Sequence, residues 1–372
     1  MIDTVILTIP EKHTTFIKNS GTEWNLFAKF GSFTKHIKQL PTAKRNDGVY
    51  RPRVTVITRG KDRFLKIEFS IPKLIFENNV DEVTEKDFDK IINKLQLRLR
   101  DWGIIIKRKN LKASEVTAFH PSKNILLSDG YTSSGVIKEL NKINLTRRMD
   151  LTKDTFRNEG QSLQFYTNSH SLVIYDKIAD LKKPKSRAID KEKTLKQTSL
   201  FDVLDKEEHM EILRIEVRLS KKVKMNSLLQ KLGYDKNPTF QDIFNEEICQ
   251  KIVSTYWQDI IAEKHLFLFS LANSPTDILK KLMQKYPTMK PKELIYLIGL
   301  QQLSTDKAGI RDLRQIVMQN ANDRTWYRIT DGFKKLNGLQ ALSDCHSWLG
   351  QVKQQIEEFI PLKVHHLLCK EK

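Results

Sequence analysis

In the first half of the chain, apolar and polar residues alternate with the period of half-buried β-strands. This pattern predicts a strand over residues 1–10, stopped by Pro10, and a hairpin whose strands, 51–59 and 63–71, flank Gly60. A polar stretch with basic clusters at 35–38 and 44–45 lies between the first strand and this hairpin. The elements predicted after the hairpin are a helix over 84–101, a strand pair at 104–106 and 116–121, a helix over 135–145, strands at 162–166 and 171–180, and a strand over 211–219.

The pattern changes beyond about residue 234, where apolar residues recur with helical spacing. Helical stripes cover 241–263, 276–286, 291–303, 308–319 and 324–335. The chain is therefore predicted to have an α+β fold. An antiparallel sheet flanked by helices would occupy residues 1–235, and an all-α domain residues 236–372. The last short helices resemble a helix-turn-helix, although an ordinary helical bundle gives the same pattern.

Charge narrows the class of partner. The 372 residues include 64 Lys and Arg against 45 Asp and Glu, a formal net charge of +19, and an excess of this size favours a polyanionic partner. No apolar run approaches the roughly 20 residues of a membrane span, and the N-terminus lacks the pattern of a signal peptide. We therefore expect a cytoplasmic protein that binds nucleic acid and no membrane. The three cysteines are far apart, which indicates neither a disulfide framework nor a zinc site.

The strand predicted at 171–180 carries the first candidate for chemistry. Side chains alternate along a strand, so Tyr175 and Lys177 are expected to share one face. A tyrosine that attacks a phosphodiester needs a nearby cation to offset the charge that develops on the phosphate. Tyrosine and lysine are also ordinary strand residues, so this segment alone is compatible with a purely structural role.

Two further strands and one strand end supply acids and an imidazole. Glu68 lies on the polar face of its strand, Glu216 lies between Arg214 and Arg218 on one face of another, and His120 ends a third. If they converge, these side chains would suit Mg²⁺ or Mn²⁺ better than zinc, because hard cations prefer oxygen ligands. Spacing in the sequence does not show that they converge.

Several basic segments are candidate DNA contacts. Residues 181–196 hold seven basic residues, two acids and no periodic apolar face, so they form either a solvated loop or an arm that contacts phosphates. The predicted DNA contacts are Lys182, Lys183, Lys185 and Arg187 in this loop, Arg214 and Arg218 on the last strand, and Arg324, Trp326, Tyr327 and Arg328 in the last helical stripe.

Five segments, in order, give the chain a resemblance to the phage and plasmid replication initiators of the filamentous-phage gene II/X family. They are the first strand up to Pro10, residues 65–74 (LKIEFSIPKL), residues 172–177 (LVIYDK), residues 213–219 (LRIEVRL) and, more loosely, residues 324–328 (RTWYR). Their order and spacing cover nearly the full length of the chain. Two departures stand out: His120 replaces an acid of the related phage proteins, and the chain has no His-hydrophobic-His triplet.

The resemblance implies a rolling-circle replication initiator with a nicking-endonuclease-like fold. Such a protein nicks one DNA strand at an origin, stays joined to the 5′ phosphate through a tyrosine, and later rejoins the ends. The resemblance places the nucleophile at Tyr175 and the strand carboxylates at Glu68 and Glu216. With the residue types added, Lys177 becomes the expected assisting cation, and Glu68, His120 and Glu216 become the expected metal ligands. Single-stranded and duplex origin DNA and a host helicase are the implied partners.

Two other functions compete with this interpretation. A tyrosine recombinase would need an H-x-x-R element, and none of the nine histidines has an arginine three places on. A non-enzymatic origin-binding protein or repressor of a mobile replicon would use the same basic charge and the C-terminal helices without a nucleophile. This second alternative stays open at the level of sequence.

Overall fold

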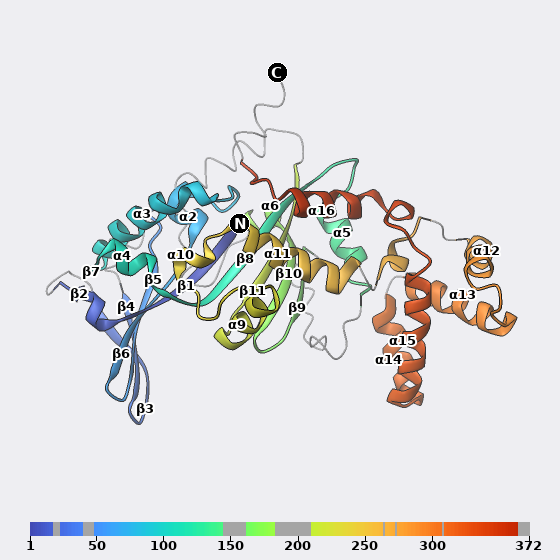
Figure 1. Cartoon of the computed structure of the whole chain (residues 1–372), viewed down its shortest axis with the longest axis horizontal. Coiled ribbons are helices and arrows are strands. Elements are labelled where there is room, and N and C mark those ends of the chain that lie inside the picture. Colours follow the sequence, from blue (N-terminus) through green and yellow to red (C-terminus); the bar gives the residue numbers. More distant parts are fainter. Residues whose placement is uncertain are drawn as a thin grey trace, which may run out of the picture.

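The computed structural model describes residues 1–17, 23–39, 48–143, 161–182, 210–262, 265–271, 274–306 and 309–363. Within these ranges nine strands form one antiparallel sheet, and many helices pack around it (Figure 1). The predicted α+β class and antiparallel sheet are therefore confirmed. In none of these ranges is a helix both long and apolar enough to cross a bilayer.

The strands of the main sheet are β1 (Ile2–Pro10), β3 (Glu23–Phe30), β4 (Phe33–Gln39), β5 (Arg53–Arg59), β6 (Asp62–Ser70), β8 (Glu115–Leu127), β9 (Ser162–Tyr166), β10 (His170–Asp176) and β11 (Glu211–Leu219). Their spatial order is β3-β4-β5-β6-β1-β8-β11-β10-β9. Two short strands, β2 (Thr14–Phe16) and β7 (Ile104–Ile106), form a separate pair.

The helices are α2 (Ile71–Phe76), α3 (Phe88–Asp101), α4 (Arg108–Lys112), α5 (Ser133–Leu140), α6 (Lys177–Lys182), α9 (Lys222–Lys231), α10 (Phe240–Ile243), α11 (Glu246–Trp257), α12 (Pro275–Lys285), α13 (Pro291–Thr305), α14 (Gly309–Asn320), α15 (Asp323–Asn337) and α16 (Ser347–Glu358). A 3₁₀ turn, η4 (Leu266–Phe269), precedes α12.

The two faces of the sheet differ in character because side chains alternate along each strand. On β1, Val5 and Leu7 are fully buried, whereas Thr4 and Thr8 are half-exposed. We call the side of Val5 the apolar face and the side of Thr4 the polar face. Helices α10 and α11 cover the apolar face. There the ring of Phe240 lies 5.9 Å from that of Phe69 on β6.

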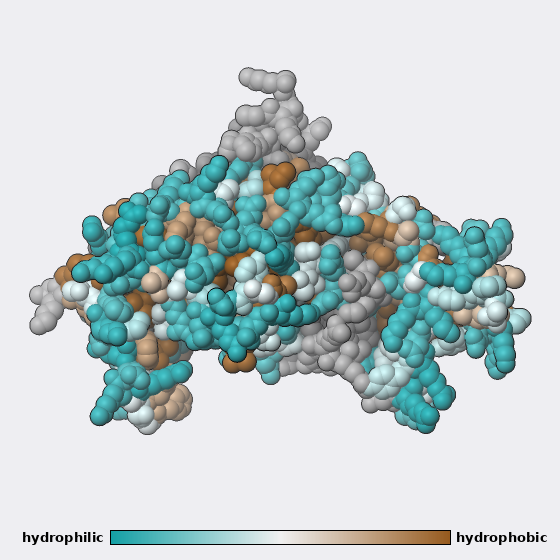
Figure 2. Space-filling view, viewed as in Figure 1, coloured by the Kyte–Doolittle hydropathy of each residue, from teal (hydrophilic) through white to brown (hydrophobic). Residues whose placement is uncertain are grey.

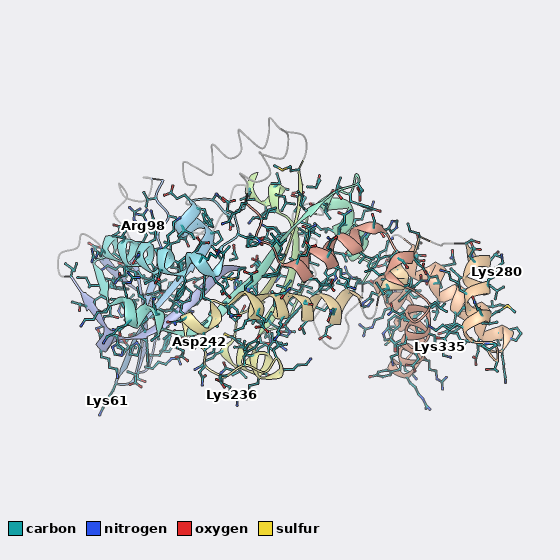
Figure 3. The ribbon with its side chains drawn as sticks, turned by 45° about the horizontal axis from the view of Figure 1, so that its top comes forward. Lys61, Arg98, Lys236, Asp242, Lys280 and Lys335 are labelled. Atoms are coloured by element: carbon teal, nitrogen blue, oxygen red, sulfur yellow. The ribbon has the colours of Figure 1, made fainter. Side chains whose placement is uncertain are left out.

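The helices α12–α15 form a helical unit at one end of the molecule (Figure 1). In Figure 3, Lys61 at the β5–β6 turn and Lys280 on α12 mark opposite ends of the long axis. The two ends of the helical unit lie side by side. Ser270, which precedes α12, forms a β-bridge with Cys345, which follows α15. The ring of Trp348 on α16 then packs 5.3 Å from that of Phe269.

This arrangement changes the expected division of the chain at residue 235. Helices α10 and α11 follow that position, yet they pack on the sheet, and α16 also contacts β8. The helices after residue 235 therefore do not all belong to one separate unit. Among the helices of the described ranges, α12–α15 are the ones that project away from the sheet (Figure 1).

Several local predictions are corrected. Residues 23–39 form the hairpin β3–β4, which escaped prediction because most of β3 is exposed and a register shift after Leu26 breaks its alternation. The strand 104–106 pairs with β2 and not with 116–121. The strand predicted to reach residue 180 ends at Asp176, where α6 takes over. The helices α2, α4, α9 and α16 were not predicted. His120, expected at the end of a strand, lies inside β8, which continues to Leu127.

Candidate functional site

The pairing of β10 with β11 places the predicted nucleophile. Tyr175 lies directly opposite Arg214, and Val173 opposite Glu216. The phenol reaches diagonally across this pair, so that its hydroxyl donates a hydrogen bond of 3.2 Å to Oε2 of Glu216. Both side chains project from the polar face of the sheet. The sequence did not show whether Tyr175 and Glu216 would meet, and the strand register brings them together.

Glu216 is the centre of this group, because three other side chains converge on it. Its Oε1 accepts a hydrogen bond of 2.7 Å from Nε of Arg218 and lies 3.4 Å from Nδ1 of His120. Burial alone would raise the pKa of Glu216, but Arg218 and the hydrogen bond with His120 hold it well below its ordinary value. Glu216 is therefore ionised in the folded protein while it accepts the Tyr175 proton in a hydrogen bond.

Tyr175 is itself buried, with 8% of its surface exposed. Burial raises the pKa of its phenol well above the ordinary value; the nearby Arg214 opposes this shift and Glu216 adds to it. The resting phenol is consequently protonated. Its activation would require a change in the charges around it.

Arg214 is buried and firmly held. Its Nη2 donates hydrogen bonds of 2.8 Å to Oδ1 of Asp3 and 2.8 Å to Oγ of Ser122. Asp3 lies at a register shift of β1 against β8, a β-bulge of the kind that redirects a side chain. Neither Asp3 nor Ser122 was singled out from the sequence. The available signal was an acid near the start of an otherwise apolar strand; its contact with Arg214 reaches across β8, which lies between β1 and β11.

Lys177 comes close to Tyr175, although it is not on the strand as predicted. It is the first residue of α6, and Asp176 caps this helix by accepting a 2.9 Å hydrogen bond from the amide of Ala179. Lys177 is fully buried, with its Nζ 5.6 Å from the centre of the Tyr175 ring. With the Asn79 amide oriented to satisfy both neighbours, its oxygen accepts a 3.1 Å hydrogen bond from Nζ of Lys177.

The group is densely charged. Lys177, Arg214 and Arg218 supply three cations, and Asp3 and Glu216 supply two anions. Asp180 is close enough to raise the pKa of Tyr175 as a further anion. The three cations are the members of this group that could contact a phosphate. We call the group, with Tyr175 and His120, the tyrosine cluster.

The predicted metal ligands are only partly brought together. His120 and Glu216 meet, but Glu68 faces Ile6 on one side of β1 while His120 faces Thr4 on the other. Two strand spacings, about 10 Å, therefore separate the backbones of Glu68 and His120. Among the described residues, no three His, Cys, Asp or Glu side chains are grouped to hold a metal ion. The residues present supply two ligands, and one of them is already bound by Arg218.

The predicted DNA contacts fall into three groups. Lys183, Lys185 and Arg187 lie outside the described residues, as does the side chain of Lys182. On α15, Arg324, Tyr327 and Arg328 are exposed. Trp326 is buried against Phe333, at 6.1 Å between ring centres, so it belongs to the core of the helical unit and not to its surface. Arg214 is buried, whereas Arg218 remains partly exposed.

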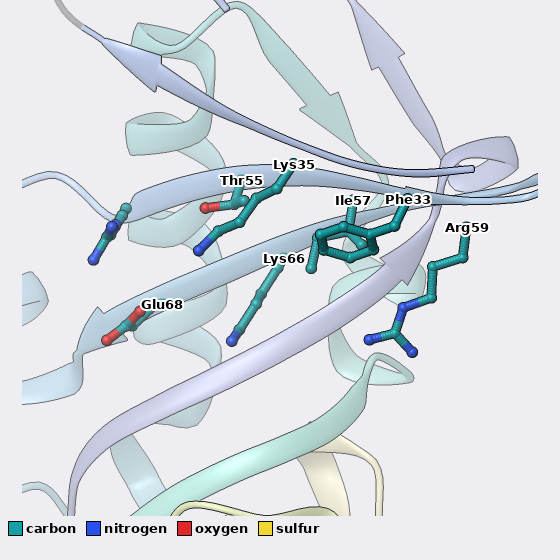
Figure 4. A pocket seen from close by; sticks show the side chains of 8 residues that line it. Phe33, Lys35, Thr55, Ile57, Arg59, Lys66 and Glu68 are labelled. Atoms are coloured by element: carbon teal, nitrogen blue, oxygen red, sulfur yellow. The ribbon is translucent and has the colours of Figure 1, made fainter. Parts of the chain in front are cut away.

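The structure also collects basic residues that were not singled out from the sequence. They line a groove on the polar face of β4, β5 and β6 (Figure 4). The lining residues are Phe33, Lys35, Arg53, Thr55, Ile57, Arg59, Lys66 and Glu68. The signal was present in the hairpin 53–59, where Arg53 and Arg59 stand at even spacing on one face. We call this feature the basic groove.

Comparisons with known proteins identify no family. No protein-family model, no curated protein and no solved structure matches the chain.

Proposed function

We propose that this protein is a rolling-circle replication initiator, a nicking and strand-transfer enzyme that uses Tyr175 as its nucleophile. The observation that carries the proposal is the hydrogen bond from the Tyr175 hydroxyl to Glu216 inside a cluster that also contains Lys177, Arg214 and Arg218. A phenol next to an ionised carboxylate and three cations has the groups that phosphoryl transfer to tyrosine requires. The resemblance of the segments around Tyr175 and Glu216 to replication initiators supports the same function.

The reaction is a transfer of a phosphodiester to tyrosine. The Tyr175 oxygen forms a bond to phosphorus, and the bond from phosphorus to the 3′ oxygen of the preceding nucleotide breaks. The electron pair leaves with the 3′ oxygen, which takes a proton from water, and the phenol proton passes to Glu216. The products are a 5′-phosphotyrosine and a free 3′ hydroxyl, and the reverse reaction rejoins the ends.

Binding of the phosphate would activate Glu216. In the resting cluster, Arg218 keeps the pKa of Glu216 too low for an efficient base. Arg218 is the most exposed cation of the cluster, with 35% of its side chain accessible. A phosphate that takes over the hydrogen bond from Arg218 would raise the proton affinity of Glu216 and place it beside the phenol proton.

The proposed ligands are a divalent cation and origin DNA. Mg²⁺ or Mn²⁺ would polarise the scissile phosphate if bound, with His120 and Glu216 as ligands from this chain. Exposed Arg324 and Arg328 on the helical unit would contact duplex origin DNA. The proposed partners are thus single-stranded and duplex origin DNA, together with a host helicase in the cytoplasm.

Covalent capture tests the proposed function. Supercoiled DNA of the cognate replicon is incubated with the protein and Mg²⁺, then denatured and resolved by electrophoresis. The wild-type chain should remain joined to the 5′ end of the nicked strand, and Tyr175→Phe should give no adduct while binding DNA normally. Tyr166→Phe and Tyr131→Phe are the matched controls. An adduct that persists in Tyr175→Phe and vanishes in either control would refute the assignment.

A second function is favoured by one observation, the burial of Tyr175 with its raised pKa. In a non-enzymatic origin-binding protein or repressor, the tyrosine cluster would be a buried polar network that fixes β10 against β11. Such a protein would bind the same DNA and leave no adduct with any of the three tyrosines. The capture experiment therefore separates the two functions.

A further inference from the structure

The basic groove has the composition of a surface that binds a nucleic-acid backbone. Four cations line it, Lys35, Arg53, Arg59 and Lys66, against one acid, Glu68. Within the described part of the chain none of the four forms an ion pair, although Arg53 lies opposite Glu68 in the β5–β6 register. Four unpaired cations on three neighbouring strands repel one another, and an anion in the groove would relieve this repulsion.

The electrostatics of Lys66 show how closely the cations are gathered. Burial lowers the pKa of Lys66; Glu68 opposes this shift, while Lys35 and Arg53 lower the pKa further. Burial therefore destabilises the charged form of Lys66, and the neighbouring cations destabilise it further. A phosphate bound between these side chains would offset it.

Aromatic rings stand among these cations. The ring of Phe33 lies between the side chains of Lys66 and Arg59 in Figure 4, and the Arg59 guanidinium is 5.9 Å from its centre. Next to it on the hairpin β3–β4, Phe27 is 63% exposed and Phe30 is 75% exposed. The Nζ of Lys35 lies 4.4 Å above the Phe27 ring. Figure 2 shows apolar residues among hydrophilic ones at the end of this hairpin, at lower left.

Cations that alternate with exposed rings are the pattern of proteins that bind single strands, in which the groove holds the phosphates and the rings stack on bases. A duplex offers no unstacked base to Phe27, Phe30 or Phe33. The groove is also small, with a cavity volume of about 210 Å³. The rings and the small volume both favour single-stranded nucleic acid over a duplex.

The basic groove and the tyrosine cluster share one face of the sheet. Glu68 is opposite Ile6, and two residues along β1 Thr4 is opposite His120. On the other edge of β8, Ser122 is opposite Glu216. From β5 to β10 there are five strand spacings, about 24 Å across the sheet. One extended strand of DNA could therefore contact both sites.

We propose that the basic groove and the Phe27, Phe30 and Phe33 rings bind single-stranded DNA and lead it across the sheet to Tyr175. The identity of the ligand as DNA rests on the proposed function. The binding itself is carried by the composition of the groove.

Binding is measured on the full-length Tyr175→Phe chain, so that cleavage cannot intervene. The probe is a fluorescently labelled oligothymidylate, followed by anisotropy over a range of salt concentrations. The double variant Lys35→Gln/Arg59→Gln should bind roughly tenfold more weakly at low salt, and its dependence of log K on log salt should be shallower by about 1.4. Phe33→Leu should weaken binding roughly fivefold or more through lost stacking.

The matched control is Lys86→Gln/Arg100→Gln, which removes two exposed charges away from the groove and should leave affinity within about twofold. Glu68→Gln provides an independent readout, because removal of the only acid of the groove should tighten binding. If the groove variants bind oligothymidylate like the control, and Glu68→Gln like the parent, the groove is not a DNA site. If the groove variants lose more affinity for duplex DNA than for oligothymidylate, the assignment to single-stranded DNA is overturned.

The two proposals can fail separately. An adduct at Tyr175 with unaltered binding in the groove variants would overturn the groove and keep the enzyme. Weakened binding in the groove variants without any adduct would keep the groove and remove the enzyme.

Discussion

The Tyr175 hydroxyl and the Glu216 carboxylate are joined by a 3.2 Å hydrogen bond, although Tyr175 lies opposite Arg214 and not Glu216 in the strand register. The diagonal contact leaves the phenol between an ionised acid and a buried guanidinium. It therefore combines an acceptor for the phenol proton with a charge that would stabilise the phenolate. An ordinary cross-strand pair would supply only one of these.

Replacing this carboxylate should separate catalysis from binding. Glu216→Gln keeps the size of the side chain but lowers its capacity to accept the phenol proton, so the rate of covalent adduct formation should fall about 10²- to 10⁴-fold. Affinity for single-stranded DNA should stay equal or rise, because a negative charge has been removed from a cationic face. Single-turnover capture and anisotropy measure the two quantities.

Glu115→Gln is the control for that substitution. Glu115 lies on β8 and is paired with Lys222, outside the tyrosine cluster. Its variant should nick DNA at the rate of the parent. If Glu216→Gln is equally active, Glu216 is a structural charge that holds Arg218 and not a proton acceptor.

Strand patterns in the sequence were sufficient to predict most of the inner strands, because their apolar residues alternate cleanly. Val5 and Leu7 on β1 are fully buried at the spacing of two that the pattern shows, and Ile67 on β6 is fully buried as its pattern predicts. The peripheral hairpin β3–β4 was missed for the opposite reason: it is largely exposed, so no buried stripe reveals it.

The site was predictable only where local spacing decides position. Alternation placed Glu216 between two arginines on one face, but the meeting of Glu216 with His120 depends on the order of β8 and β11 in the sheet. Glu68 was assigned to the same set because it is also a strand carboxylate, and the register moves it to the basic groove instead. Strand order and register are long-range properties that spacing in one chain does not encode.

The metal requirement should follow this geometry. Nicking should stop in excess EDTA and return with Mg²⁺ or Mn²⁺. His120→Asn should raise the concentration of Mg²⁺ required, because His120 lies 3.4 Å from Glu216. Glu68→Gln should leave this concentration unaltered, because Glu68 lies beyond β1. Full activity in excess EDTA would remove the metal from the proposal, and a raised requirement in Glu68→Gln would contradict the positions given by the register.

Two residues of α15 should behave oppositely on substitution. Trp326 is buried, so Trp326→Ala should destabilise the helical unit by roughly 3–5 kcal/mol. Arg328 is exposed, so Arg328→Gln should change stability by less than about 0.5 kcal/mol. Only Arg328→Gln should weaken the footprint on duplex origin DNA without a loss of fold. Thermal unfolding and footprinting measure the two effects, and an unaltered footprint in Arg324→Gln/Arg328→Gln would make the unit a packing or partner-binding element.

A buried carboxylate next to the inner strand β8 should control stability in acid. Oε2 of Glu82 lies 3.0 Å from Nζ of Lys123 on β8 and accepts a 2.9 Å hydrogen bond from the amide of Leu362. Burial alone would raise the pKa of Glu82, but Lys123 and the other partners lower it from 4.5 to about 2. Because the folded pKa is below the unfolded one, the carboxylate stabilises the fold above about pH 4.5. This contribution is lost as the pH falls toward 2.

The size of the effect follows from the shift of the pKa. A change from 4.5 to about 2 corresponds to about 3 kcal/mol, of which about 2 kcal/mol should disappear between pH 6 and pH 3. Glu82→Gln should already be destabilised at pH 6, because Lys123 loses its buried counter-charge, and should change less between the two pH values. Urea unfolding at each pH measures this difference. Glu357→Gln, an exposed substitution on α16, is the control and should follow the wild type; an equally steep loss in Glu82→Gln would show that other carboxylates govern acid stability.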